Sequence, residues 1–118
     1  MIIELENIKN MSMGYRFMRL IVFFDLPTQT RKNLQNYNQF RRFLIKEGFA
    51  MMQESVYTKI LSNGTMAGLL RERIKKNAPP KGLVQMLLVT EKQFASIEFV
   101  VGESKSMIEN SDKRFVVY

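Results

Sequence analysis

The sequence predicts a single α+β domain in which one antiparallel sheet carries two helices on the same face. Strand-like segments and two stretches of helical periodicity follow one another in the order β-α-β-β-α-β. The chain is also short, at 118 residues, so one hydrophobic core is the expected arrangement. Residues 1–13 precede the first strong pattern, and we expect them to be an extension of a domain spanning residues 14–118.

The first strand is predicted over residues 15–25, where the apolar run "LIVFF" ends at Asp25. Such a run is typical of a strand that is buried on both faces. One face of the strand is expected to carry Leu20, Val22 and Phe24. The other face is expected to carry Arg19, Ile21, Phe23 and Asp25. Pro27 cannot donate to a central ladder, so the strand should end at Asp25.

A helix is predicted over residues 30–47, with Thr28 or Thr30 as its N-cap and Gly48 at its end. Its apolar side is predicted to consist of Leu34, Tyr37, Phe40, Phe43, Leu44 and Ile45. The opposite arc holds Arg31, Lys32, Gln35, Asn38, Gln39, Arg42 and Lys46. Because this arc contains no acid, it favours a phosphate-facing surface over an ordinary solvated face, which is the alternative.

Two short strands, 49–53 and 55–61, should form a tight hairpin or one bent strand. A second helix is predicted over residues 65–77, ended by the two prolines at 79 and 80. Its buried stripe is predicted to be Met66, Leu69, Leu70 and Ile74. A buried strand at 82–90, a helical turn at 91–97 and short strands at 98–101 and 114–118 are predicted to follow.

This element order predicts the ferredoxin-like fold with one or two extra C-terminal strands. Both helices then cover one face of the sheet, and Ile21 and Phe23 would be exposed on the other. The simplest cover for that face is a second copy of the chain, packed sheet to sheet about a two-fold axis. We therefore expect a homodimer.

Composition narrows the possible chemistry. The chain contains no Cys and no His, which excludes thiol chemistry and the usual zinc sites. Any catalysis would depend on carboxylates, with an oxygen-preferring ion such as Mg²⁺. The net charge of +7 favours a nucleic-acid partner. No apolar run approaches the ~20 residues that span a bilayer, and no signal peptide is recognisable, so we expect a cytoplasmic protein with no membrane partner.

Asp25 is the main candidate for chemistry, because no other acid lies between Glu6 and Glu47. A structural role is the first interpretation: the carboxylate can accept backbone N–H bonds from the turn that follows. The second interpretation is a metal ligand. A two-fold dimer would supply a second Asp25, and the pair could hold Mg²⁺ against a phosphodiester and activate a water molecule.

Three segments resemble a known family: "MRLIVFFDLPT" (18–28), "YNQFRRFLIKEGFAMMQESVYTK" (37–59) and "KGLVQMLLVTEKQF" (81–94). They closely resemble the CRISPR-associated endoribonuclease family, the smaller of the two universal spacer-acquisition proteins, and look like a type II member. The resemblance covers residues 13–118 and leaves out residues 1–12. Its markers are the strand-end acid Asp25 and the residues Gln53, Ser55, Val56 and Tyr57.

The resemblance implies a homodimer that lies between two dimers of the CRISPR integrase subunit and binds double-stranded DNA, both protospacer and array. It implies that Asp25 is a Mg²⁺ ligand for phosphodiester hydrolysis, and that integration itself belongs to the partner. In that role the expected phosphate contacts are Arg31, Arg42 and Lys46, and then Arg19, Lys75, Lys76 and Lys81.

Three functions are therefore compared. The first is a dimeric scaffold of the spacer-integration complex, and the second is a Mg²⁺-dependent endonuclease that cleaves RNA or DNA through Asp25. The third is a module of the RNA-recognition type, which shares the element order. That module needs exposed aromatic residues and a motif that "SVYTKIL" (55–61) does not match.

Overall fold

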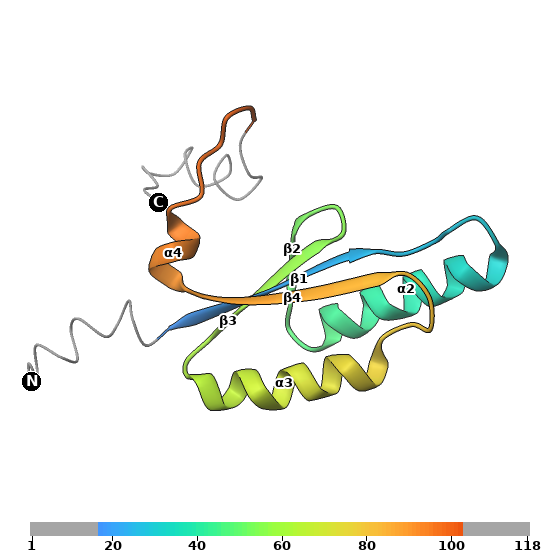
Figure 1. The fold of residues 1–118 in the computed structure, drawn as a ribbon, viewed down its shortest axis with the longest axis horizontal. Helices are drawn as coiled ribbons and strands as arrows, with labels where there is room; N and C mark the ends of the chain where they lie inside the picture. Colours follow the sequence, from blue (N-terminus) through green and yellow to red (C-terminus); the bar gives the residue numbers. More distant parts are fainter. Residues whose placement is uncertain (1–16, 103–118) are drawn as a thin grey trace, which may run out of the picture.

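The computed structural model describes residues 17–102, which form a four-stranded antiparallel sheet with two long helices on one face (Figure 1). The strands are β1 (Met18–Asp25), β2 (Ala50–Gln53), β3 (Val56–Leu61) and β4 (Leu83–Thr90). The helices are α2 (Arg31–Lys46), α3 (Gly64–Asn77) and the short α4 (Glu91–Ala95). The strand order β2-β3-β1-β4 confirms the predicted ferredoxin-like α+β fold.

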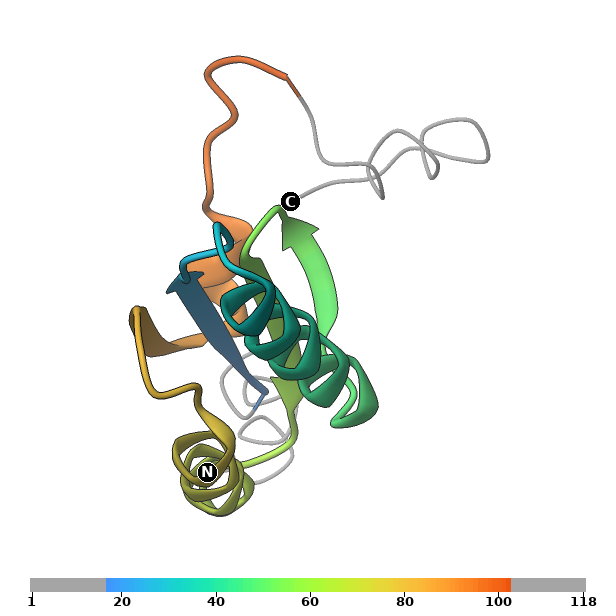
Figure 2. The same cartoon turned by 90° about the vertical axis from the view of Figure 1, so that its right-hand side faces the viewer.

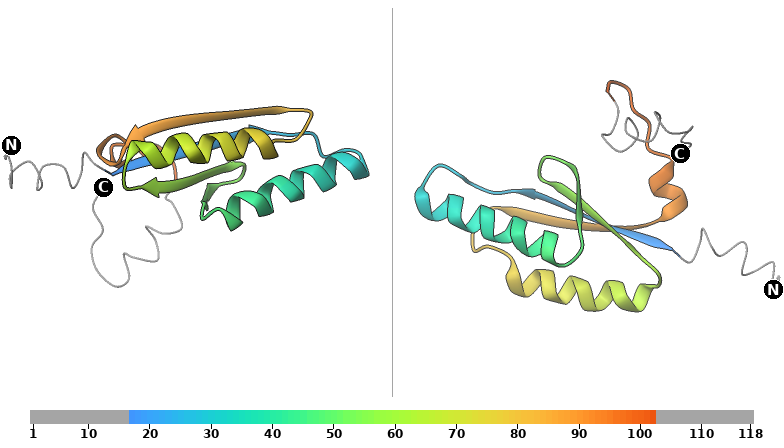
Figure 3. Two further views of the ribbon diagram at one scale, coloured as in Figure 1. Left: turned by 90° about the horizontal axis from the view of Figure 1, so that it is seen from below. Right: turned by 180° about the vertical axis from the view of Figure 1, so that it is seen from behind.

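The register of the sheet decides which side chains share a face. β1 is central: Ile21 lies opposite Thr58 of β3 and opposite Leu87 of β4. β2 and β3 form a hairpin whose register shifts between Met51 and Gln53, so the hairpin interpretation of residues 49–61 is confirmed, with a bulge. α2 and α3 run side by side along one face of the sheet (Figures 2 and 3).

Local hydrogen bonds fix the ends of the helices. The Thr30 hydroxyl accepts from the Asn33 N–H at 3.0 Å, so Thr30, rather than Thr28, is the N-cap of α2. At the other end, Gly48 has a φ of 100°, and the Lys59 ammonium donates to the Glu47 carbonyl at 2.6 Å. A cation at this position stabilises α2, because carbonyl groups without partners accumulate at a helix C-terminus.

The core lies between the helices and the sheet. Leu20, Val22 and Phe24 of β1 are buried there, as the alternation predicts. Phe24 is the centre of an aromatic cluster: its ring stacks on Tyr57 at 5.7 Å and meets Phe40 edge to face at 5.3 Å. Such ring geometries add stabilisation beyond area burial alone. The buried end of β1 is therefore rigidly packed up to the residue before Asp25.

The predicted apolar sides of both helices are too wide. Leu34 and Ile45 of α2 are 45% and 47% exposed, and Met66 and Leu69 of α3 are 44% and 55% exposed. The residues that are buried are Phe40 and Leu44 in α2, and Ala67, Leu70 and Ile74 in α3. The reason is geometric: a helix lying on a sheet buries only the narrow stripe that touches it.

The strand predicted at 98–101 is wrong. Residues 97–102 follow α4 as coil and bends, with Val100 and Val101 92% and 90% exposed. A strand needs a neighbouring edge to complete its hydrogen bonds, and this segment pairs with none in the described part of the chain. The strand predicted at 114–118 and the extension predicted at 1–13 lie outside the described residues.

Candidate functional site

Asp25 is the last residue of β1, where it lies opposite Leu83 of β4. Its side chain is exposed, although both neighbours, Phe24 and Leu26, are buried. Within residues 17–102, the carboxylate has no ion-pair partner and accepts no hydrogen bond from the turn that follows. The described structure therefore gives Asp25 no capping role and leaves its oxygen atoms available to a ligand.

The backbone at Asp25 is held from two sides. On one side, the Phe24 N–H donates to the Ser55 carbonyl at 3.0 Å, and Ser55 has a φ of 65°, in the left-handed region. On the other side, a Cβ atom at Gly82 would lie 2.9 Å from the Asp25 carbonyl oxygen. The β2–β3 turn and the start of β4 thus clamp this strand end.

This clamp gives part of the "SVY" sequence a structural role. Ser55 provides the turn carbonyl, and Tyr57 is only 1% exposed because its ring stacks beneath Phe24. The Ser55 hydroxyl has no basic partner within the described residues, which fits a turn role rather than that of a nucleophile.

The donor set around Asp25 fits Mg²⁺ only in part. No group of three or more potential metal-ligating side chains (His, Cys, Asp or Glu) occurs in residues 17–102. Mg²⁺ takes six oxygen ligands but commonly keeps several waters and binds through one or two carboxylates plus substrate phosphate. A single exposed carboxylate on a rigid strand end is therefore compatible with such an ion, provided that water, phosphate or a second chain supplies the other ligands.

The sheet face opposite α2 and α3 is mostly apolar and partly exposed, with Ile21 and Thr58 buried. We call it the open face; its described members include Arg19, Ile21, Phe23, Asp25, Val56, Thr58, Ile60, Leu83, Gln85, Leu87 and Val89. Ile60, Leu83 and Leu87 are 47%, 53% and 50% exposed. These three residues lie on one face of the sheet, but β1 separates Ile60 from the two leucines and Gln85 lies between the leucines. The face is therefore a candidate interaction surface made of separate apolar side chains rather than one continuous patch. Asp25 lies at one end of this face.

Most of the predicted phosphate contacts are exposed cations. Arg31, Arg42, Lys46, Lys76 and Lys81 are exposed and form no ion pair with any described residue. Lys75 lies 3.4 Å from Glu72, but both side chains are more than 60% exposed, so this pair leaves the lysine largely solvated. The acid-free arc of α2 is thus a solvent-facing basic surface, and no described acidic side chain pairs with its cations.

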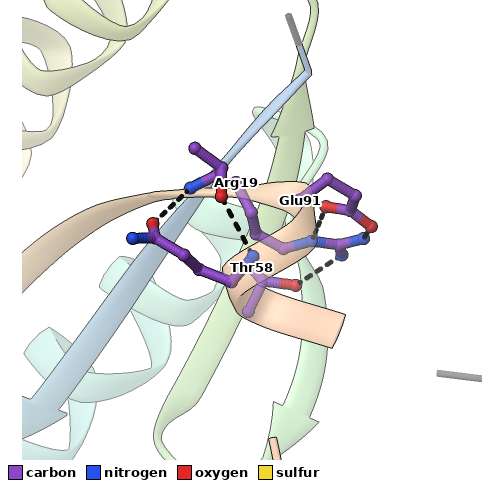
Figure 4. Close-up of polar contacts among 5 residues, drawn as sticks. Arg19, Thr58 and Glu91 are labelled. Carbon is purple, nitrogen blue, oxygen red and sulfur yellow. Dashed lines mark hydrogen bonds and ion pairs between the residues drawn. The ribbon is translucent and has the colours of Figure 1, made fainter. Parts of the chain in front are cut away.

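Arg19 differs from the other cations. Its guanidinium donates to both carboxylate oxygens of Glu91, at 2.9 and 2.5 Å (Figure 4). Its charge is therefore neutralised within the chain, and Arg19 is not available as a phosphate contact. The sequence contains no local signal for this pair, because the two residues are 72 positions apart and meet only after β1 and β4 have paired.

Comparisons with known proteins give one consistent result. The family model described as "CRISPR associated protein Cas2" matches residues 18–97, a range that includes Asp25 and the 53–57 segment. Among the described helices, none is long and apolar enough to span a membrane.

Several curated proteins named "CRISPR-associated endoribonuclease Cas2" are similar over nearly their full length. The protein from Treponema denticola is 53% identical over 100 residues, covering 85% of this chain and 99% of the relative. The protein from Lacticaseibacillus rhamnosus is 47% identical with the same coverage. A solved structure described as a crystal structure of Cas2 superposes with a TM-score of 0.54 and 27% identity, covering 76% of this chain and 92% of that chain.

Proposed function

Because the chain belongs to the Cas2 family of CRISPR-associated proteins, we propose that it is the dimeric scaffold of a spacer-acquisition complex. In this role it binds duplex DNA through the phosphate backbone and lies between two dimers of the CRISPR integrase subunit. The observation that carries the proposal is the division of one small domain into an apolar open face and an acid-free basic helix surface.

The open face supports association between two copies. Two-fold packing brings the same surface of each chain together, so that Ile60, Leu83 and Leu87 of both copies leave water. Burying these half-exposed side chains is favourable in proportion to the apolar area removed. The prediction that Ile21 would be exposed on this face is wrong, because Ile21 is only 7% exposed in the single chain; the apolar area left for a second copy is therefore mainly that of Ile60, Leu83 and Leu87.

The basic residues support binding to phosphate rather than to base edges. Arg31, Arg42 and Lys46 are exposed and unpaired within the described structure. A helix surface with this composition neutralises the phosphate charge of the DNA backbone and releases counterions. Contacts of this kind do not depend on the base sequence. A central scaffold for arbitrary spacers needs binding of this kind.

The test is a salt titration of DNA affinity. Fluorescence anisotropy with two duplexes of equal length and unrelated sequence should give similar affinities that fall steeply with salt. Replacing Arg31, Arg42 and Lys46 together with Gln should flatten the slope of log K against log salt by about 0.9 for each lost phosphate contact. Arg73→Gln is the matched control, because Glu47 already neutralises Arg73 at 2.8 Å.

Two results would contradict the proposal. One is an affinity that changes little with salt, and the other is a strong preference for one of the two sequences. The control removes one charge and the triple variant removes three, so a loss of slope in Arg73→Gln of about one third of that in the triple variant would show that net charge, rather than the α2 surface, governs binding.

A second function has its own support. The rigid, exposed and unpaired Asp25 suits a Mg²⁺-dependent endonuclease acting on RNA or DNA, and the curated relatives carry the name endoribonuclease. Mg²⁺ bound by Asp25 and its copy would polarise a phosphodiester and lower the pKa of a bound water. The chain itself contributes the exposed carboxylate and the backbone contacts of Ser55 and Gly82 that hold the end of β1.

The RNA-recognition alternative receives no such support. β3 presents Val56, Thr58 and Ile60 to the open face, whereas its aromatic residue, Tyr57, is buried in the core. Stacking of unpaired bases requires aromatic rings on the exposed face of the sheet, and Phe23 of β1, which is half-buried, is the only aromatic residue among the members of the open face named above.

A further inference from the structure

α4 is too short to be stable without contacts to the rest of the protein. It has five residues, and none of its side chains is buried. A capping box between Thr90 and Gln93, with both bonds at 2.9 Å, closes its first turn, but these bonds tie the helix only to itself. Helices of this length are not stable in isolation, so contacts with the rest of the protein must fix α4 in place.

Four of the contacts described for α4 and its surroundings involve Arg19. The Nε and Nη2 atoms of its guanidinium donate to the two oxygens of Glu91, and Nη1 donates to the Thr58 hydroxyl at 3.3 Å (Figure 4). The guanidinium carbon lies 4.1 Å from the centre of the Phe94 ring. One side chain thus joins β1, β3 and α4, and it draws α4 onto the side of the sheet away from α2 and α3 (Figure 1).

The surroundings make this contact stronger than a surface ion pair. The side chains of Arg19 and Glu91 are only 21% and 29% exposed, and Thr58 is 5% exposed. A planar guanidinium can bind a carboxylate with two parallel bonds while stacking on a ring, which a lysine ammonium cannot do. Within residues 17–102, the α4 backbone is tied to the start of β1 by the bond from the Glu91 N–H to the Phe17 carbonyl, at 3.1 Å.

We propose that Arg19 is a positioning residue for the C-terminal part of the chain: by seating α4, it fixes the direction in which residues 97–102 leave the sheet. This exit segment exposes Phe99, Val100 and Val101, at 40%, 92% and 90%. Because these apolar side chains are exposed, they are available for association with a second copy of the chain. The position of α4 depends only on contacts within one chain. The use of the exit segment in assembly, in contrast, rests on the function proposed above.

Amide hydrogen exchange tests the seating directly. Arg19→Gln should speed exchange across residues 91–97, including the Glu91 N–H, by about tenfold or more, since bonds to charged groups are among the stronger ones. Exchange in the centre of β1 and β3 should change much less. Glu91→Gln, which keeps Arg19, should produce the same local effect. It replaces Arg19→Gln in this experiment if Arg19→Gln fails to fold.

The matched control is Arg73→Gln, which breaks the other Arg–Glu pair between elements, that of Arg73 with Glu47 at 2.8 and 3.1 Å. It should leave residues 91–97 as in the wild type. Unchanged exchange at 91–97 in both Arg19→Gln and Glu91→Gln would overturn the proposal, as would equal acceleration in the control.

Sedimentation velocity on the same proteins examines the use of the exit segment. Weaker self-association of Glu91→Gln, which leaves Arg19 of the open face in place, with wild-type behaviour of Arg73→Gln, would support a role in assembly, and equal association of these two variants and the wild type would remove that role. A wild-type chain that stays monomeric would contradict the proposed dimer, whereas the exchange results would still decide how α4 is seated.

Discussion

A Cβ atom added to Gly82 would lie 2.9 Å from the carbonyl oxygen of Asp25 and 2.7 Å from a methyl group of Leu26. Gly82 also has a φ of 102°, which side chains disfavour. Gly82→Ala should therefore lower the free energy of unfolding by roughly 1–3 kcal/mol through backbone strain and overpacking. Thermal denaturation followed by circular dichroism measures this loss.

Gly68→Ala is the control for that substitution. Gly68 lies within α3, and an added Cβ would meet no atom within 4 Å. Alanine there should raise stability by up to about 1 kcal/mol, because it favours the helix over the unfolded chain. An unchanged melting temperature for Gly82→Ala would show that the strand end at Asp25 is not clamped as described.

Leu44 and Ile45 are neighbours in α2 with opposite environments: Leu44 is 0% exposed and Ile45 is 47% exposed. Leu44→Ala should destabilise the protein by about 2–5 kcal/mol, since it removes core contacts and leaves a cavity. Ile45→Ala should cost less than about 1 kcal/mol. Urea denaturation compares the two, and similar losses would contradict the narrow buried stripe assigned to α2.

The order of elements could be predicted because it depends on local patterns. Alternation places Leu20, Val22 and Phe24 on the core face of β1, and they are buried. The widths of the helix faces could not be predicted, because hydrophobicity does not distinguish a side chain facing the core from one facing solvent or another chain. Leu34 and Leu69 have the helical spacing of core residues and yet are about half exposed.

Some features of the candidate site could likewise be predicted from the sequence, and others could not. Asp25 stands out in the sequence because it ends an apolar run, and the structure leaves its carboxylate exposed. Arg19 resembles the other basic residues in the sequence, but its role depends on Glu91, 72 positions away. The clamp formed by Ser55 and Gly82 likewise depends on backbone conformations at φ of 65° and 102°, which composition alone does not reveal.

Leu87 lies on the open face and is 50% exposed, so the proposed dimer would bury it. Leu87→Glu should leave the fold intact and shift the protein toward the monomer, because a carboxylate would have to enter an apolar interface. Leu69→Glu is the matched control, since Leu69 is 55% exposed on α3, away from that face. Light scattering coupled to size-exclusion chromatography measures both, and a Leu87→Glu variant that stays dimeric would place the interface elsewhere.

Asp25→Asn tests the central claim, that this chain acts as a scaffold rather than as a catalyst. The substitution keeps the shape of the side chain, and Asp25 has no partner in residues 17–102, so stability should change by about 0.5 kcal/mol or less. The measurement is spacer integration by the variant together with the integrase subunit, beside Mg²⁺-dependent cleavage of RNA and DNA by the variant alone. If the chain is a scaffold, integration should proceed at the wild-type rate even if cleavage disappears. Loss of integration by a variant that is folded, dimeric and still binds DNA would contradict it.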